Sequence, residues 1–538
     1  MSHQLKWAPL WLLCLTSLLG LPLARLSADE PIDADLLLVG GTLHIGDGSA
    51  GHVGDLAIAD DRIVAVGRFE HGRVKKQVDC RGLIISPGFI DLHNHSDSPA
   101  TSKRTRAAVN YLTQGCTTIV TGNCGSGPID VSDYYAKLDE RGIGLNIAHL
   151  LPQGSLRREV MQSERRDATQ EELEEMKSLA ATAMADGAWG MSTGLIYVPS
   201  SYADTAELTE IAKVVSDHGG IYASHIRGEG TGLIDAVNEA LEIGRAAEIP
   251  VHISHFKSSG KDSWGLVRVA VDLIQERREA GQVVTADQYP YIASSTSLSA
   301  TLIPAWARAG GTKQMLERLA EGEDTSRIHE AIRKKLELTD QGQRIQIARY
   351  RPDPSWAGRR LKEIADHQGI DPFDLVLTIL KRDSGTKIVN YGINEQDVRY
   401  VMQQPWVATA SDGSAKIPSE EIPPPRNYGT FPRKIGFYAV REKVIPLEEA
   451  IRSASGLSAD ILGLNARGYL RAGAYADVAV WSEQELIDKA TFESPHRYSE
   501  GIRYLLVNGT PAIWEGQVTG ALAGRALRHP SSGNAGSR

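Results

Sequence analysis

The sequence has 538 residues, of which 42% are hydrophobic and 23% are charged. This is an ordinary globular composition, so it excludes a largely disordered chain, and the length allows one large domain with a smaller one. The net charge of −9 is spread along the chain without a basic run, which argues against a nucleic-acid partner and favours a small-molecule substrate.

The first thirty residues differ from the rest of the chain. Lys6 precedes the apolar run WAPLWLLCLTSLLGLPL, and small residues follow at Ser27-Ala28. This order predicts a secretory signal peptide over residues 1–28, and hence export to the periplasm or the cell exterior. Two prolines interrupt the apolar run, which is at the short limit for a spanning helix, so we expect no permanent membrane span.

Both ends of the remaining chain predict short strands. Two apolar runs turn at Asp60-Asp61, and near the C-terminus Asn508-Gly509 is a strong hairpin turn between two further runs. The two ends therefore predict one small sheet domain, through which the chain enters and leaves. Its expected segments are residues 33–82 and 466–528.

Eight short apolar runs recur through the middle, and most are followed by apolar residues at helical spacing, as in residues 169–186 and 205–218. Alternating helices and uniformly apolar strands predict a parallel sheet covered by helices, and eight repeats are the number that closes a barrel. The predicted fold class is therefore α/β, a (β/α)8 TIM-like barrel over residues 83–465. The candidate strands are 82–90, 117–122, 144–149, 187–192, 220–225, 250–255, 282–287 and 406–411.

One connection in this pattern is much longer than the others. About 120 residues separate the seventh candidate strand from the eighth, with helical patches near 312–338. We expect an insertion over about residues 292–400, and its position beside the mouth of a barrel suggests a lid.

Metal-ligand side chains follow five of the candidate strands. In a barrel of this kind the active site lies at the C-terminal ends of the strands, so these residues should meet at one rim. They are His93 and His95 after the first strand, Cys124 after the second, His225 after the fifth, His255 after the sixth and Asp412 after the eighth.

Each of these residues also has a simpler interpretation. A lone histidine is more often a hydrogen-bonded structural residue, Cys124 a small packing residue, and Asp412 the cap of a loop or helix. Together, however, Cys124, His225 and His255 are a three-ligand catalytic zinc set with a position open for water. Beside such a site, Asp412 could act as the general base.

The other cysteines predict no chemistry. Cys116 and Cys124 flank a strand whose ends would lie too far apart for a disulfide, so we expect both to stay reduced. Cys80 is most simply a small buried residue. The sequence also contains no GxSxG, HExxH or GxxxxGK[ST] motif, which argues against a serine hydrolase, a zincin or a P-loop protein.

A set of motifs links the sequence to a known family. They occur in order between about residues 33 and 528: PGFIDLHNH, GCTTIVTGNCG, GLIYVPSSYA, SHIRGEG, SHFKSSG, DQYPY, PWVATASDGS and PRNYGTFPR. With these motifs the sequence resembles the amidohydrolase superfamily, specifically its N-acyl-D-amino-acid deacylases (D-aminoacylases). The resemblance implies a (β/α)8 barrel with a small β-sandwich from both termini. It also implies zinc-dependent hydrolysis of an N-acyl-D-amino acid to a carboxylate and a D-amino acid.

The resemblance also assigns roles in the metal site. It implies that Cys124, His225 and His255 hold one zinc tightly, and that His93, His95 and Asp412 form a second, weaker site with Asp412 as the proton shuttle. Many superfamily members bridge two metals with a carbamylated lysine at the end of strand four, but GAWGMSTG contains no lysine. Cys124 takes the corresponding coordination space in this interpretation.

The resemblance further implies how the substrate is bound. Lys257, Tyr289 and Arg426 match the family's α-carboxylate binders, and Tyr197 lines the substrate pocket. Without the resemblance, Lys257 and Arg426 would be more simply explained as solvated surface charges.

Two departures from the family pattern, Gln153 and Pro424 in place of histidines, leave the side-chain and acyl preference open. The alternative functions are a cyclic-amide or D-dipeptide hydrolase on the same scaffold, or a secreted binding protein that has lost catalysis. Lys257 and Arg426 argue against a cyclic amide, which has no free α-carboxylate, and the complete set of metal-site residues argues against loss of catalysis.

Overall fold

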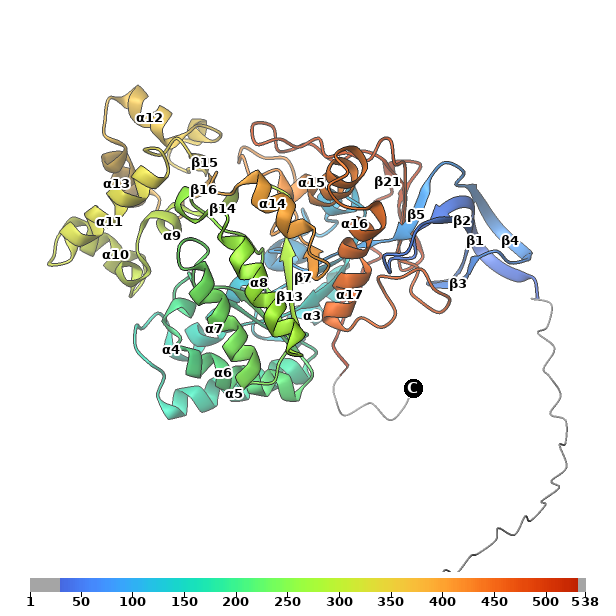
Figure 1. Cartoon of the computed structure of the whole chain (residues 1–538), viewed down its shortest axis with the longest axis horizontal. Helices are drawn as coiled ribbons and strands as arrows, with labels where there is room; N and C mark the ends of the chain where they lie inside the picture. Colours follow the sequence, from blue (N-terminus) through green and yellow to red (C-terminus); the bar gives the residue numbers. More distant parts are fainter. Residues whose placement is uncertain (1–29, 531–538) are drawn as a thin grey trace, which may run out of the picture.

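The computed structural model describes residues 30–530 (Figure 1). The predicted signal peptide, residues 1–28, lies outside these described residues. Within them, no helix combines the length and the apolar character needed to cross a membrane.

Strands from both ends of the chain form one nine-stranded sheet, which β5 and β18 join by antiparallel pairing. The sheet order is β21-β20-β19-β18-β5-β1-β2-β3, with β4 also paired to β1. Asn508 and Gly509 both have positive φ and form the hairpin turn that the sequence predicts. The strands are β1 (Ile32–Leu43), β2 (His52–Ala59), β3 (Arg62–Gly67), β4 (His71–Asp79), β5 (Ile84–Pro87), β18 (Val478–Trp481), β19 (Ile502–Val507), β20 (Thr510–Trp514) and β21 (Gln517–Val518).

The middle of the chain contains parallel strands in two sheets, so the predicted α/β class is confirmed. Their orders are β6-β7-β8 and β17-β13-β12-β11-β10-β9. Backbone bonds link the edges of the two sheets. Just after β6 and β17, the amide of Asp412 donates to the His93 carbonyl at 2.9 Å; at the opposite edges, the amide of Trp189, just before β10, donates to the carbonyl of His149 at the end of β8. The strands are β6 (Phe89–Asp91), β7 (Cys116–Thr121), β8 (Asn146–His149), β9 (Leu151–Pro152), β10 (Gly190–Gly194), β11 (Ile221–His225), β12 (Val251–Ile253), β13 (Val284–Gln288) and β17 (Val407–Thr409).

One predicted strand, residues 82–90, is two strands in the structure. Pro87 ends β5 and Gly88 precedes β6, so the first half pairs in the terminal sheet and the second half in a parallel sheet. Gly88 packs against Thr117, and a Cβ at residue 88 would lie 2.2 Å from the Thr117 side chain. The terminal sheet therefore extends beyond the expected boundary at residue 82.

Helices cover the parallel strands on the outside (Figure 1). The capping box of α5, in which Thr169 and Glu172 bond each other's backbone amides, begins this helix at its predicted position. The helices around the strands are α1 (Asp97–Thr101), α2 (Val109–Leu112), α3 (Val131–Arg141), α4 (Gln153–Met161), α5 (Gln170–Ala185), α6 (Thr205–Asp217), α7 (Leu233–Ala246), α8 (Leu266–Glu279), α14 (Glu395–Met402), α15 (Arg426–Pro432), α16 (Leu447–Ala454) and α17 (Gly456–Leu462), with a π-helix at Arg433–Arg441.

The parallel strands are buried on both faces. Neighbouring residues of one strand belong to different hydrophobic clusters, as Ile119 and Val120 do in β7 and Ile147 and Ala148 do in β8. Since side chains alternate along a strand, one cluster lies between the strands and the helices and the other lies on the opposite face.

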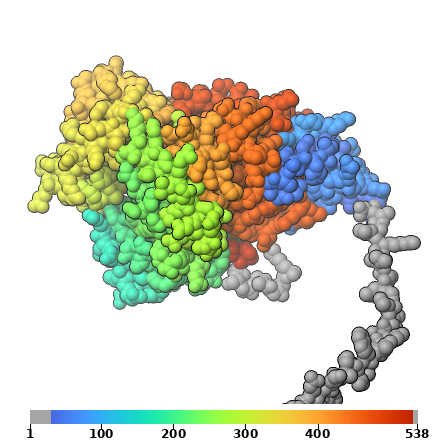
Figure 2. Space-filling model, viewed as in Figure 1, coloured from blue at the N-terminus to red at the C-terminus, as the bar shows by residue number. Residues whose placement is uncertain are grey.

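Residues 294–390 form a unit with its own small sheet and its own hydrophobic cluster, which includes Ile332, Ile364 and Leu375. The unit (yellow) and the N-terminal strands (blue) lie at opposite ends of the molecule (Figures 1 and 2). The sheet order is β14-β16-β15, and both pairings are antiparallel. Its elements are β14 (Ser294–Ser297), α9 (Leu298–Leu302), α10 (Thr312–Ala320), α11 (Thr325–Leu338), β15 (Ile345–Arg349), α12 (Leu361–Gln368), α13 (Pro372–Arg382) and β16 (Lys387–Asn390).

Candidate active site

The six side chains expected at a metal site meet at the C-terminal ends of the parallel strands. His225 is the last residue of β11, and the others lie in the segments directly after β6, β7, β12 and β17. Cys124, His255 and Asp412 all have positive φ, a conformation that is uncommon for residues other than glycine and recurs at functional sites. The six residues are His93, His95, Cys124, His225, His255 and Asp412.

A tight turn directs the thiol of Cys124 into this site. Gly122, Cys124 and Gly125 have φ values of 78°, 52° and 67°, so the chain reverses immediately after β7. At residue 122 a Cβ would lie 2.0 Å from the Leu150 carbonyl oxygen, which only glycine avoids. The two flanking glycines therefore allow the backbone to turn closely enough to present the sulfur inward.

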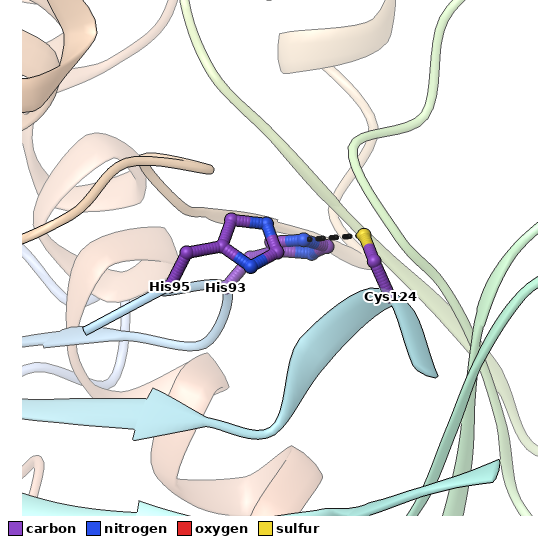
Figure 3. A group of neighbouring side chains, drawn as sticks. All are labelled: His93, His95 and Cys124. Atoms are coloured by element: carbon purple, nitrogen blue, oxygen red, sulfur yellow. Dashed lines mark hydrogen bonds between the residues drawn. The ribbon is translucent and has the colours of Figure 1, made fainter. Parts of the chain in front are cut away.

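The Cys124 sulfur lies among three imidazoles. Its Sγ is 3.2 Å from His93 Nε2, 3.5 Å from His225 Nδ1 and 3.6 Å from His255 Nε2. Figure 3 shows the rings of His93 and His95 directed toward the sulfur. Within residues 30–530 there are two groups of three possible ligand residues, and in each group the ligand atoms lie within 4.8 Å of one another. Both groups contain Cys124, one with His93 and His95 and the other with His225 and His255.

The second group fits a zinc ion by its chemistry and by two of its three separations. Thiolate and imidazole are ligands that zinc favours, and bonds of about 2.0–2.3 Å in a tetrahedron place ligand atoms about 3.3–3.8 Å apart. The two separations from Cys124 match this spacing, whereas His225 Nδ1 and His255 Nε2 lie closer, at 2.8 Å. Burial opposes ionisation of the thiol, but the positive charges of His93 and His225 hold the pKa of Cys124 well below its ordinary value.

Asp412 lies between a histidine of the metal site and a buried arginine. Its Oδ1 is 3.0 Å from His95 Nε2, and its Oδ2 is 3.0 Å from Arg426 Nη1. Burial alone would raise the pKa of Asp412, but Arg426 and His95 lower it well below the ordinary value. The carboxylate is therefore ionised and positioned at the edge of the metal site.

A cavity of about 590 Å³ opens onto these groups. Tyr197, Lys257 and Arg426 line it together with Cys124 and Asp412. The Tyr197 hydroxyl lies 3.2 Å from Thr296 Oγ1 of β14, so residues 294–390 contribute to the wall of the cavity.

Tyr289 does not line the cavity but packs against two cations that do, Lys257 and Arg426. Its ring is 4.5 Å from the Arg426 guanidinium carbon and 5.5 Å from Lys257 Nζ, which supports both cations by cation–π contact. Its hydroxyl is buried and has no hydrogen-bond partner among the described residues. Tyr289 therefore contacts the cations expected to bind the α-carboxylate, while its ring does not line the cavity itself.

Two carboxylates that the sequence interpretation missed hold the histidines in place. Asp287, at the end of β13, accepts the His255 amide at 2.6 Å and lies 2.8 Å from His252 Nε2 and 3.4 Å from His93 Nδ1. Glu229 Oε1 lies 2.6 Å from Lys257 Nζ and 3.0 Å from His255 Nδ1. Asp287 is the last residue of the predicted strand 282–287, as His225 is of its strand, so the rule that found the histidines could have found it. Glu229 lies in a loop and carries no such signal.

The two departures from the family pattern lie in different surroundings. Gln153 is fully buried, where its amide donates to Glu207 at 3.1 Å and its carbonyl accepts from Ser200 at 2.5 Å, so it ties α4 to its neighbours. Pro424 lines the cavity.

The cysteines outside the site are free and buried. Cys80 is buried, as expected, and Cys116 forms no disulfide with Cys124. Burial raises the pKa of the Cys80 and Cys116 thiols, that of Cys80 to about 12. Among the three described cysteines, the low pKa belongs to Cys124.

Comparison with known proteins identifies the group to which this site belongs. The model of the "Amidohydrolase family" matches residues 76–513. A D-aminoacylase of Alcaligenes xylosoxydans xylosoxydans is 36% identical over 516 residues, 92% of this chain and 97% of that protein. An N-acyl-D-aspartate deacylase of the same organism is 31% identical over 92% of this chain and 94% of that protein.

A solved structure shows the same similarity in three dimensions. N-acyl-D-glutamate deacylase from Bordetella bronchiseptica, complexed with zinc and a phosphonate inhibitor, superposes with a TM-score of 0.79 at 30% identity, covering 92% of this chain and 100% of that one. The family match and these full-length relatives agree with the motifs and with the geometry of the strand ends. The chain is a member of the amidohydrolase family, in the branch that contains the D-aminoacylases.

Proposed function

We propose that this protein is a metal-dependent hydrolase that cleaves the amide bond of N-acyl-D-amino acids, releasing a carboxylate and a D-amino acid. The observation that carries the proposal is the cavity in which the thiol and imidazoles around Cys124 meet Asp412 and the cations Lys257 and Arg426. Its relatives are named for this reaction on D-amino-acid substrates.

We infer that zinc is the metal and that Cys124, His225 and His255 hold one ion tightly. His93, His95 and Asp412 form a second, weaker site. Two observations support this difference in affinity: His95 is partly exposed, and Asp412 is already paired with Arg426, whereas the first group is buried. The thiol of Cys124 belongs to the first site and faces His93 of the second, where related enzymes use a bridging group.

The proposed mechanism assigns one task to each side chain. Cys124, His225 and His255 would hold the zinc ion, which would supply Lewis acidity for the scissile carbonyl and the attacking water. Asp412 accepts the proton that the water loses as its oxygen bonds to the carbonyl carbon, and it returns that proton to the nitrogen as the carbon–nitrogen bond breaks. Lys257 and Arg426 bind the α-carboxylate, and Tyr289 orients them from behind.

We further infer a closed (β/α)8 barrel over residues 83–465 with an insertion over about residues 292–400. The backbone bonds between the ends of β6 and β17, and the burial of the strands on both faces, support closure. The terminal sheet, residues 33–82 with β5 and residues 466–528, forms the accompanying small β-sandwich.

We also propose that the protein is exported to the periplasm or beyond, because residues 1–28 have the order of a signal peptide. Mass measurement of the protein purified from the producing cell tests this. Loss of about 28 residues from the N-terminus supports export, and an intact N-terminus on a cytoplasmic protein contradicts it.

One experiment tests the function itself: turnover of N-acetyl-D- and N-acetyl-L-amino acids by the zinc-loaded protein, with zinc measured on the same sample. Asp412→Asn should lower kcat about a hundredfold or more and retain the zinc of the first site. The control is Asp397→Asn, a buried carboxylate that bonds Ser258 and Gly265 away from the cavity. Hydrolysis of cyclic amides or D-dipeptides in preference to every N-acyl-D-amino acid would support the rival hydrolase, and absence of any turnover a binding protein.

A further inference from the structure

The cavity is also lined by a group of three cations and one carboxylate. Arg349, Lys387, Lys416 and Glu421 line the same cavity as Cys124. Glu421 Oε2 is 3.1 Å from Lys416 Nζ, and its Oε1 is 3.5 Å from Arg349 Nη1. Lys387 has no ion-pair partner within residues 30–530, so this group keeps a surplus of two positive charges.

The strand pairing places two of these cations against each other. Arg349 on β15 pairs with Lys387 on β16, next to a register irregularity between Ile347 and Arg349. Like charges directly opposite on antiparallel strands are destabilising. Lys387 is exposed on β16, and Arg349 Nε is buried without a hydrogen-bond partner among the described residues. An anion bound by both the Arg349 and the Lys387 side chains would relieve this repulsion.

A single segment connects these cations to the reacting end of the cavity. Residues 412–426 begin with Asp412, pass through Lys416 and end at Arg426, and the amide of Ile422 donates to the Ala348 carbonyl at 2.9 Å. The segment therefore runs along β15, and the surplus charge lies on the same wall as Asp412. In the proposed function Lys257 and Arg426 bind the α-carboxylate, so the other three cations remain available for a different anionic group.

We propose that Arg349, Lys387 and Lys416 form a subsite for a second carboxylate of the substrate, so that the enzyme prefers N-acyl-D-amino acids with two carboxylates. This proposal rests on the proposed function. The second carboxylate can belong to the amino-acid side chain, as in N-acetyl-D-glutamate, or to the acyl group, as in N-succinyl-D-alanine. The recognition chemistry is the same in both cases, a carboxylate bound by guanidinium and ammonium donors.

The test compares kcat/KM within two matched pairs of substrates on the zinc-loaded protein. N-acetyl-D-glutamate against N-acetyl-D-glutamine probes the side chain, and N-succinyl-D-alanine against N-butyryl-D-alanine probes the acyl group. The measured quantity is kcat/KM for the dicarboxylate substrate divided by kcat/KM for its neutral analogue. In whichever pair carries the recognised carboxylate, Lys387→Gln and Arg349→Gln should each lower this ratio about tenfold or more, the effect expected for loss of a hydrogen bond to a charged group. Lys387→Arg should keep the ratio, because it keeps the charge.

Lys381→Gln is the control, since Lys381 is exposed on α13 in the same unit and does not line the cavity. A ratio that falls in one pair for Lys387→Gln but not for Lys387→Arg or Lys381→Gln supports the subsite and identifies its carboxylate. Flat ratios in both pairs overturn it, and so does an equal fall with Lys381→Gln. If the protein hydrolyses N-acetyl-D-methionine and the ratios do not change in any variant, the subsite is wrong but the proposed function stands. If it hydrolyses no N-acyl-D-amino acid, the proposed function is wrong as well.

Discussion

The thiol of Cys124 lies within 3.6 Å of three imidazole nitrogens, although in the sequence it stands alone between glycines. Packing and metal binding are both ordinary uses of a small buried cysteine. The structure favours metal binding, because burial without neighbouring cations would raise the pKa of the thiol, as it does for Cys116, and here the imidazoles lower it.

Replacing Cys124 by alanine should abolish tight zinc binding, because two imidazoles remain where three ligands met. Zinc content after dialysis against a weak chelator measures the effect. Cys116→Ala, eight positions earlier in the chain and also buried, should keep its zinc. An alanine variant at residue 124 with full zinc content would refute the ligand role.

Asp287 contacts two of the proposed metal-ligand histidines, at His93 Nδ1 and at the His255 amide. A carboxylate at Nδ1 keeps the proton on that nitrogen and leaves Nε2 of His93 free for a ligand bond.

Asp287→Asn should therefore weaken zinc binding about 10- to 100-fold, as is usual for a carboxylate that supports a metal-ligating histidine. Competition with a chromophoric chelator gives the dissociation constant. Asp383→Asn is the control, since Asp383 is a buried carboxylate paired with Arg351 in the insertion. Equal zinc affinities in the two variants would show that Asp287 has no special role.

At the scale of elements, the turn after β7 is the feature on which the site depends most. The apolar run before it predicts the strand, but the positive φ of Gly122, Cys124 and Gly125 follows from close packing against the loops after β8 and β10. The run at residues 82–90 failed as one predicted strand for a related reason. Residues 84–90 are all buried, and burial by itself does not tell which of two sheets a segment joins.

Gly122→Ala should lower the thermal midpoint and displace Cys124. A side chain in the left-handed region costs about 1–2 kcal/mol, and here the new methyl group also meets the Leu150 carbonyl. Gly265→Ala is a matched control, because Gly265 also has positive φ but no atom lies within 4 Å of the added Cβ. We expect the variant at residue 122 to lose more stability and more zinc than the control. Equal losses would mean that the close approach to Leu150 is unimportant.

At the scale of the whole molecule, the terminal sheet pairs strands from both ends of the chain, and the parallel strands position the site residues at their C-terminal ends. Short apolar runs separated by turns at both ends of the chain predict one sheet. The pairing of β5 with both β1 and β18, however, depends on contacts between residues far apart in sequence. One buried charge in this assembly was not predicted. Lys434 lies in the π-helix with 1% of its surface exposed, and its Nζ has no hydrogen-bond partner among residues 30–530.

Lys434 makes global stability depend on pH, because burial lowers its pKa from 10.5 to about 7. Between these values the unfolded chain binds a proton that the folded protein does not, so stability falls as the pH decreases from about 10.5 to 7. Each pKa unit corresponds to about 1.4 kcal/mol, and the full window to several kcal/mol.

Lys434→Met should therefore be more stable than the parent at pH 7, with the difference shrinking toward pH 10. Thermal midpoints of both proteins across this range measure it, and Lys381→Gln should follow the parent. A constant difference between parent and Lys434→Met would mean that this lysine is charged in the folded state.

The sequence by itself determined the alternation of strands and helices, the long stretch between the seventh and eighth candidate strands, and the residue types at the strand ends, because apolar periodicity and side-chain chemistry are local properties. It also carried the family motifs. Only the tertiary structure decided that Cys124 lies in both ligand groups, that Asp287 and Glu229 hold the histidines, and that Arg349 and Lys387 face each other on neighbouring strands. These relations join residues tens to hundreds of positions apart, and their distances are set by strand register and close packing, which periodicity along the chain does not specify.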